Sequence, residues 1–173
     1  MAGSPTISAV FAPRIVVGVA ELAVTNQTAA TLSTYALGSC IGLVAYDPLA
    51  RAAGLLHLML PDSTISPEKA ARQPAMFADT GVPALFNAMA GVRAQRSRIN
   101  LYVAGGASVL SGPDSFQIGE RNAVAVRRTL AVYGCRIAGF EVGGVVNRTL
   151  HLNVGTGELT IKMPDRTFSA SLA

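Results

Sequence analysis

The chain has 173 residues, half of them hydrophobic and 14% charged. This length supports one domain with a substantial core and excludes a small disulfide-stapled protein, while the low charged fraction favours layers that are covered on both sides. The 14 basic and 10 acidic residues give a net charge of +4 without a basic run interleaved with aromatic residues, so no nucleic-acid site is predicted.

The sequence also bears on compartment and redox state. No apolar stretch approaches the ~18 residues that span a bilayer. Residues Met1–Pro5 lack the positive and apolar regions of a secretory signal. We therefore expect a cytoplasmic protein without direct membrane insertion, in which Cys40 and Cys135 are free thiols.

The first half of the chain alternates apolar runs with turn signals, a pattern typical of β-structure. After a loose arm, the strands are predicted at residues 14–20, 31–37, 40–46 and 52–60. The second of these ends in a bend at Gly38 and Ser39. The last two flank the turn signal Asp47–Ala50 and predict a β-hairpin.

The second half of the chain mixes helical and strand periods. Apolar residues recur at helical spacing after Pro67, which predicts a long amphipathic helix that bends at Pro83 and ends near Gly91. A second helix is predicted at 119–133. The remaining predicted strands are 99–104, 136–142, 148–154 and 159–163. Strands outnumber helices, which indicates an α+β fold with mixed or antiparallel sheets and two main helices on one side.

The hairpin carries the candidate chemistry. If Tyr46 and Arg51 close a four-residue loop, Cys40 and His57 lie directly opposite each other on one face, with Cβ atoms roughly 4.5 to 5.5 Å apart. A neighbouring imidazole can take the thiol proton, and the imidazolium then stabilises the thiolate. A slip of one residue would separate the two side chains onto opposite faces.

Each of these residues also has a structural interpretation. Cys40 alone is a small hydrophobe, and His57 in an apolar run is equally compatible with a hydrogen-bonded core histidine. A catalytic base needs a group that orients its second nitrogen, and Thr34 is the candidate, through its hydroxyl or its carbonyl. Ser39 is the competing candidate.

Metal and cofactor sites are not predicted. Cys40, His57, Cys135 and His151 lack the close spacings typical of zinc sites. The glycine pairs at 105–106 and 143–144 lack a phosphate-binding frame and instead predict close backbone packing.

Several segments together resemble one family. They are Thr34–Cys40, His57–Asp62, Gly105–Ala107, Ile118–Asn122, and Gly143–Gly144 followed by Arg148. In this combination the chain is similar to CheD, the chemoreceptor glutamine deamidases of bacterial and archaeal chemotaxis. The similarity runs over residues 14–163, so we expect one domain there, with flexible termini at 1–13 and 164–173. Tyr102–Ala104 and Asn147 depart from the family pattern without touching the site.

The resemblance implies a three-layer α/β/β sandwich and a Cys-His-Thr triad on Cys40, His57 and Thr34. Backbone N–H groups at the Gly38–Ser39 bend are the oxyanion candidates. The implied reaction converts glutamine, and some methylated glutamates, on the cytoplasmic domain of chemoreceptors to glutamate through a thioester. The implied partner in some organisms is a CheC-type phosphatase. The alternative is a non-catalytic adaptor that binds chemoreceptors or that phosphatase.

Overall fold

The computed structural model describes residues 12–109 and 115–173. Its strands form two five-stranded sheets. The outer sheet has the order β1 (Arg14–Val16), β3 (Thr31–Leu37), β8 (Arg148–Asn153), β9 (Glu158–Lys162) and β10 (Thr167–Ser171). The central sheet has the order β2 (Glu21–Thr25), β5 (Ala52–Leu58), β4 (Ile41–Asp47), β6 (Asn100–Gly105) and β7 (Arg136–Val142).

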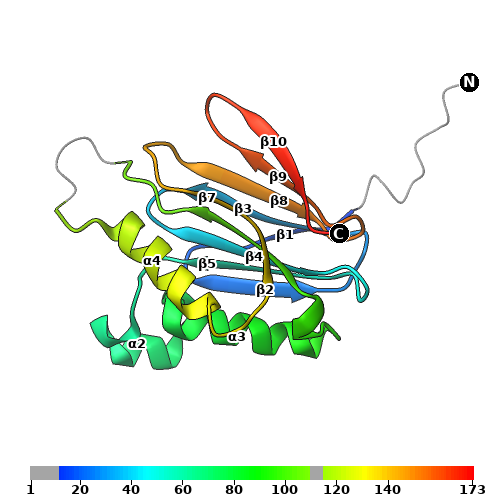
Figure 1. Cartoon of the computed structure of the whole chain (residues 1–173), viewed down its shortest axis with the longest axis horizontal. Helices are drawn as coiled ribbons and strands as arrows, with labels where there is room; N and C mark the ends of the chain where they lie inside the picture. The colour runs from blue at the N-terminus through cyan, green and yellow to red at the C-terminus, as the bar shows by residue number, and fades with distance from the viewer. Residues whose placement is uncertain (1–11, 110–114) are drawn as a thin grey trace, which may run out of the picture.

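Helices cover the side of the central sheet that faces away from the outer sheet (Figure 1). They are α2 (Pro67–Arg72), α3 (Ala78–Gly91) and α4 (Ile118–Leu130), with short 3-10 turns at Ser63–Ile65, Pro74–Met76 and Arg96–Arg98. Each sheet contains one parallel pair, β1–β3 or β6–β7, among antiparallel ones. The predicted α+β fold and its three layers are confirmed.

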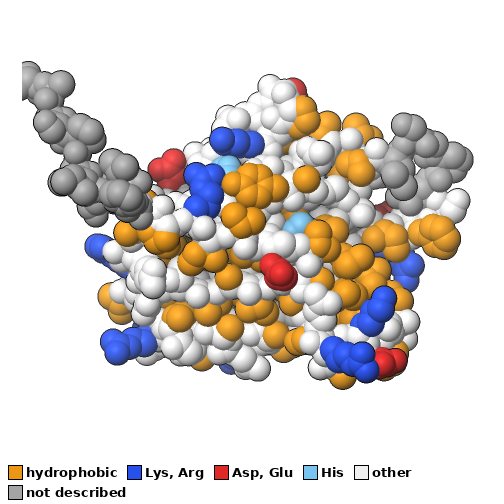
Figure 2. Space-filling view, turned by 180° about the vertical axis from the view of Figure 1, so that it is seen from behind, with side chains coloured by type: hydrophobic (Ala, Val, Ile, Leu, Met, Phe, Trp, Pro, Cys, Tyr) orange, Lys and Arg blue, Asp and Glu red, His pale blue; other side chains and the backbone are white. Residues whose placement is uncertain are grey.

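Burial follows from this layering. Every residue of β4 and β5 is buried, because the central sheet is covered on both faces. One apolar cluster lies between the two sheets and a second lies between the central sheet and the helices. The surface in turn carries few charges, and Figure 2 shows hydrophobic side chains spread over much of one face.

The predicted first strand is divided between the two sheets. β1 ends at Val16, Ala20 adopts a left-handed conformation with φ of 62°, and β2 begins at Glu21. This turn carries the chain from the outer sheet to the central sheet, so a single strand over 14–20 was wrong and β2 was missed.

The predicted helix from Pro67 to Gly91 is interrupted before Pro74. Gln73, which precedes Pro74, has φ of −141° and ψ of 69°, outside the helical region. Proline disfavours the α conformation of the residue before it, so α2 ends there. Pro83 lies inside α3.

The C-terminal segment differs from the flexible tail expected at residues 164–173. β10 pairs with β9 along its whole length, and Leu172 is fully buried with its N–H bonded to the Gly157 carbonyl. Of the N-terminal arm expected at residues 1–13, residues 1–11 lie outside the described part of the chain.

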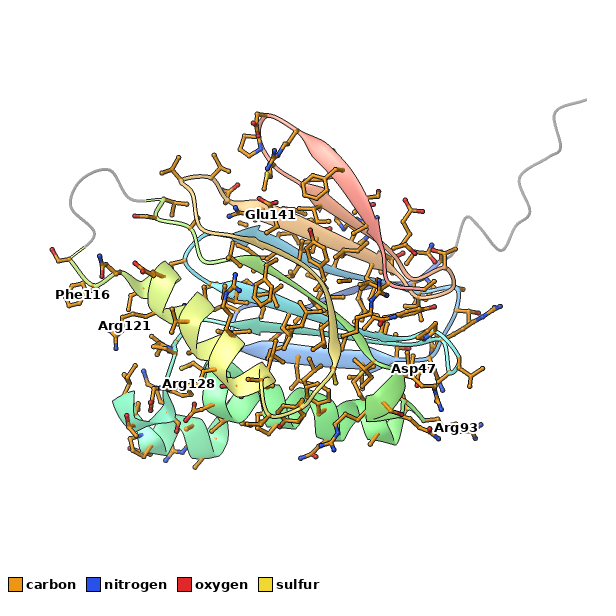
Figure 3. All side chains as sticks on the ribbon, in the orientation of Figure 1. Asp47, Arg93, Phe116, Arg121, Arg128 and Glu141 are labelled. Atoms are coloured by element: carbon orange, nitrogen blue, oxygen red, sulfur yellow. The ribbon has the colours of Figure 1, made fainter. Side chains whose placement is uncertain are left out.

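A buried carboxylate fixes the end of the β4–β5 hairpin. Asp47 accepts hydrogen bonds from the N–H groups of Leu49, Ala50 and Gln95. It also forms an ion pair with Arg98 at 2.7 Å. Figure 3 shows Asp47 at the end of the molecule away from the start of α4.

We expect Asp47→Asn to lower the free energy of unfolding by about 3 kcal/mol at neutral pH, because it breaks a buried ion pair. Burial opposes ionisation of Asp47, but hydrogen bonds from Arg98 and from backbone N–H groups outweigh it and lower its pKa to about 2. The carboxylate therefore stabilises the fold fully above about pH 4 and loses this effect as the pH falls toward 2.

Urea unfolding at neutral pH and near pH 2 measures both effects. The exposed Asp165→Asn is the matched control and should unfold like the wild type. A neutral-pH difference for Asp47→Asn no larger than that of the control would contradict the expectation.

Candidate active site

The hairpin register places His57 opposite Gly42, not opposite Cys40. Asp47 and Ala52 close the loop, one residue later on each strand than predicted. Part of the reason is local, since the Asp47 side chain accepts two N–H groups of the turn and Arg51 takes a left-handed conformation with φ of 46°. The predicted direct pairing of Cys40 with His57 is therefore wrong.

The register nevertheless keeps the two side chains on one face. Each partner has moved by one residue, so alternation along the strands is preserved. Cys40 packs against the cluster between the two sheets, and His57 reaches Thr34 on the outer sheet. Both side chains therefore project into the layer between the sheets, at the end opposite Asp47.

Thr34 fixes the orientation and the tautomer of His57. Its Oγ1 lies 2.8 Å from the His57 Nδ1 and 2.8 Å from the Val17 carbonyl oxygen. The hydroxyl has one proton, and two oxygens at that distance repel unless a proton lies between them. The hydroxyl therefore donates to Val17 and accepts from Nδ1–H, which leaves Nε2 of the neutral imidazole as the basic nitrogen.

That basic nitrogen is buried and unpaired. His57 is 2% exposed, and its Nε2 has no hydrogen-bond partner in the described part of the chain. The half-buried thiol of Cys40 is thus not hydrogen-bonded to it. Catalytic hydrogen bonds often form only when substrate is bound.

Burial keeps both groups neutral. It raises the pKa of the Cys40 thiol. It also lowers the pKa of His57, although the Val17 carbonyl and the Glu21 carboxylate act in the opposite direction. A resting thiolate–imidazolium pair, which the sequence led us to expect, is therefore not favoured; proton transfer would accompany attack.

Every carbonyl of the bend before β4 is held by a neighbouring segment. The carbonyl oxygen of Gly38 accepts from Ala107 N–H at 2.8 Å, and that of Cys40 accepts from Gly106 N–H at 2.8 Å. The carbonyl oxygen of Ser39 accepts from Asn122 Nδ2 at 2.9 Å. The carbonyl of Ser39 is thus bonded to α4 and does not orient His57, and two segments, the loop after β6 and α4, hold the bend that presents Cys40.

The glycines after β6 permit this close approach. A Cβ at Gly105 would collide with the Cys40 carbonyl oxygen, and Gly105 has φ of 114°. Gly106 also has a positive φ, of 62°. The prediction of close backbone packing is confirmed for this pair. It is wrong for Gly143 and Gly144, where an added Cβ would meet no backbone atom within 4 Å.

A cavity of about 500 Å³ adjoins the bend. Its lining comes from the loop after β6, the start of α4 and the loop after β7: Gly106, Ser108, Gln117, Gly119, Glu120, Ala123, Val142, Gly143 and Gly144. Gly106 bonds the Cys40 carbonyl, so the cavity wall and the Cys40 backbone are directly joined.

The other cysteine and histidine lie elsewhere. Cys135 packs on the helix side of the central sheet, and His151 accepts or donates a 2.8 Å hydrogen bond to Ser33 on the outer sheet. Within residues 12–109 and 115–173, no group of three or more His, Cys, Asp or Glu side chains could hold a metal ion.

Two contacts of the candidate site had no signal in the sequence. Val17 contributes a main-chain carbonyl, which any residue carries. Asn122 lies in a segment noted only for family resemblance, and its contact with Ser39 depends on how α4 docks.

We expect Thr34→Val to reduce kcat of the deamidation that the resemblance implies by about tenfold, because one orienting hydrogen bond of about 1 to 1.5 kcal/mol is lost. Thr34→Ser keeps the hydroxyl and serves as the matched control, with activity near that of the wild type. Steady-state rates on a glutamine-bearing receptor fragment provide the measurement. Equal activity of Thr34→Val and Thr34→Ser would show that the hydroxyl does not orient His57.

The pH dependence follows from the same contacts. Because burial lowers the pKa of His57, we expect Nε2 to stay unprotonated below the ordinary histidine value of about 6.5. The proposed deamidation should therefore lose activity on the acid side only below that pH, since protonated Nε2 cannot accept the thiol proton. A pH profile of kcat/KM tests this, and an acid limb above about 6.5 would contradict it.

A family model and curated relatives point to the same family. A family model described as CheD chemotactic sensory transduction matches residues 59–163. A "Probable chemoreceptor glutamine deamidase CheD" from Solibacter usitatus is 47% identical over 86% of this chain and 88% of its own length. A "Probable chemoreceptor glutamine deamidase CheD 1" from Syntrophus aciditrophicus is 41% identical over 86% of this chain and 92% of its own length.

A third relative, a "Probable chemoreceptor glutamine deamidase CheD" from Haloarcula marismortui, is 40% identical over 86% of this chain and 84% of its own length. None of the helices in residues 12–109 and 115–173 has the length and apolar character to cross a membrane. Identities at this level over nearly the whole chain, together with the family match, establish the relationship. The chain belongs to the CheD family.

Proposed function

We propose that this chain hydrolyses the side-chain amide of chemoreceptor glutamines, with Cys40 as nucleophile and His57 as general base and acid. The observation that carries the proposal is the Thr34–His57 hydrogen bond. It leaves Nε2 buried, without a hydrogen-bond partner among the described residues, on the face that Cys40 shares. The names of the relatives support the substrate class.

In the first half of the reaction, the thiol proton passes to Nε2 as Cys40 Sγ attacks the amide carbon. The C–N bond then breaks, and the imidazolium donates its proton to the departing nitrogen, which leaves as ammonia. Cys40 is now linked to the substrate through a thioester.

In the second half, Nε2 takes a proton from water as the water oxygen attacks the thioester. The C–S bond breaks, and the proton returns to the thiolate. The product is a glutamate side chain. Thr34 stays neutral throughout and holds Nδ1, so its role is orientation.

The tetrahedral intermediate needs hydrogen-bond donors for its oxyanion. The N–H groups at Ser39 and Cys40 are the candidates, because the carbonyls of this bend are already bonded to neighbouring segments and its conformation is set before substrate binds.

Incubation with purified receptor cytoplasmic fragments, followed by peptide mass spectrometry, tests the proposal. We expect specific glutamines to become glutamates with the wild type and to persist with Cys40→Ala. A wild type that binds receptor but never deamidates it would favour the adaptor.

Partner and compartment follow from the same proposal. The proposed substrate is the cytoplasmic domain of the chemoreceptor, so the enzyme would act in the cytoplasm. A CheC-type phosphatase stays a prediction; co-purification of the two proteins would test it.

A further inference from the structure

Asn122 is a buried polar side chain at the candidate active site that has no role in the proposed chemistry. It lies in the second turn of α4 and is fully buried. Its neighbours Arg121 and Arg128 are exposed on the outer side of the same helix (Figure 3). The helix therefore turns an amide toward the sheet and its cations toward solvent.

The amide nitrogen of Asn122 bridges two strand ends. It donates to the Ser39 carbonyl at 2.9 Å and to the Met59 carbonyl at 3.0 Å. Both acceptors are carbonyl oxygens, so the nitrogen must face them, and both amide protons are used. Ser39 precedes Cys40, and Met59 follows His57 by two residues.

These carbonyls lie where the β4–β5 ladder ends. Ile41 and Leu58 form its last pair, and the next pair would be Cys40 with Met59. That pair does not form, because the N–H groups of Met59 and Leu60 both donate to the Met76 carbonyl and the chain leaves the sheet. Without main-chain pairing, the Asn122 amide joins the two diverging ends.

The remaining atom of this side chain indicates what it does. Oδ1 of Asn122 is buried without a hydrogen-bond partner in the described part of the chain. An unpaired buried acceptor is unfavourable. The contribution of the side chain to the fold therefore lies in its two donated bonds.

We propose that Asn122 is a positioning residue that sets the separation of the Cys40 thiol and the His57 imidazole by holding the two strand ends together. This inference rests on the proposed roles of Cys40 and His57. Without the bridge, Ser39 and Met59 would no longer be joined beyond the last ladder pair, Ile41 with Leu58. A displacement of about 1 Å in reacting groups can cost on the order of 10²-fold in rate.

Three variants separate positioning from general destabilisation. Asn122→Ala removes both donors, and Asn122→Asp keeps the shape but not the two N–H groups. Val126→Ala is the matched control, because Val126 is fully buried one turn later in α4 and belongs to the apolar cluster beneath it. All are assayed at a temperature at which circular dichroism shows them folded.

The first readout is steady-state deamidation of a receptor fragment. We expect Asn122→Ala and Asn122→Asp to lower kcat on the order of 10²-fold with KM little changed. Val126→Ala should retain the wild-type kcat. Unchanged kcat in both Asn122 variants, or an equal loss in Val126→Ala, would overturn the proposal.

The second readout needs no substrate. The rate of Cys40 alkylation by iodoacetamide is measured with and without His57→Ala, and Cys135 is the internal reference. We expect His57→Ala to slow alkylation in the wild-type and Val126→Ala backgrounds and to have no effect with Asn122→Ala, because thiol and imidazole are then uncoupled. A coupling that persists in Asn122→Ala overturns positioning. If Asn122→Ala loses the coupling but the wild type deamidates no receptor fragment, positioning by Asn122 is supported and the proposed function is rejected.

Discussion

Cys40→Ala is expected to abolish glutamine deamidation, with a loss in kcat on the order of 10⁴- to 10⁶-fold, while the protein stays folded and binds receptor fragments. Removal of a nucleophile that acts in a concerted catalytic unit produces losses of this size. The substitution removes little volume from a half-buried position. Peptide mass spectrometry of receptor fragments provides the measurement.

Cys135→Ala is the matched control for this variant. Cys135 is also half-buried, but it lies on the helix side of the central sheet, where its thiol contacts the Arg96 carbonyl at 3.4 Å. The Cys135→Ala protein should deamidate receptor fragments at the wild-type rate. Deamidation by Cys40→Ala at the wild-type rate would show that Cys40 is not the nucleophile.

His57→Ala is expected to be similarly inactive, because no other group then takes the thiol proton. Effects within one catalytic unit are not additive, so Cys40→Ala combined with His57→Ala should be no worse than either change alone. His151→Ala is the matched control, since His151 lies on the outer sheet with a hydrogen bond to Ser33.

The variant leaves Thr34 and Val17 hydrogen-bonded to each other, so folding should persist. Circular dichroism checks this independently of activity. Substantial deamidation by a folded His57→Ala protein would require a different base and would reject the assigned role.

The hairpin shows how far the sequence predicts the site. Its two apolar runs predicted both strands and the shared face of Cys40 and His57. The register was missed by one residue on each strand, because it depends on the Asp47 side chain bonding its own turn and on Arg98 from a distant segment. The Arg98 contact joins segments that are distant in the sequence, and it leaves no local pattern.

The two short strands β2 and β10 were not predicted from the sequence. β2 and β10 are short and carry few large apolar residues, so the hydrophobic pattern that marks β4 and β5 is weak in them. They form because neighbouring strands pair with them. The contacts of the Val17 carbonyl and the Asn122 amide also depend on segments that are distant in the sequence, so only the structure identifies them.

The sequence also did not predict the ionisation state of Cys40 and His57. Residue types indicated a thiol beside an imidazole, and an activated thiolate was the natural expectation. Burial raises the pKa of Cys40, and the depth of burial depends on how two sheets and α4 meet. Nucleophilic attack by the Cys40 thiol stays a proposal, and burial does not favour the resting thiolate that the residue types suggested.

Interception of the acyl-enzyme with hydroxylamine tests the central claim most directly. A thioester between Cys40 and the glutamine side chain would react with hydroxylamine to give a hydroxamate on the receptor and the free thiol. Mass spectrometry of receptor fragments should find this hydroxamate at the deamidated positions with the wild type and at none with Cys40→Ala. Glutamate formation by the wild type without any hydroxamate, at hydroxylamine concentrations that trap a reference thioester, would contradict covalent catalysis by Cys40.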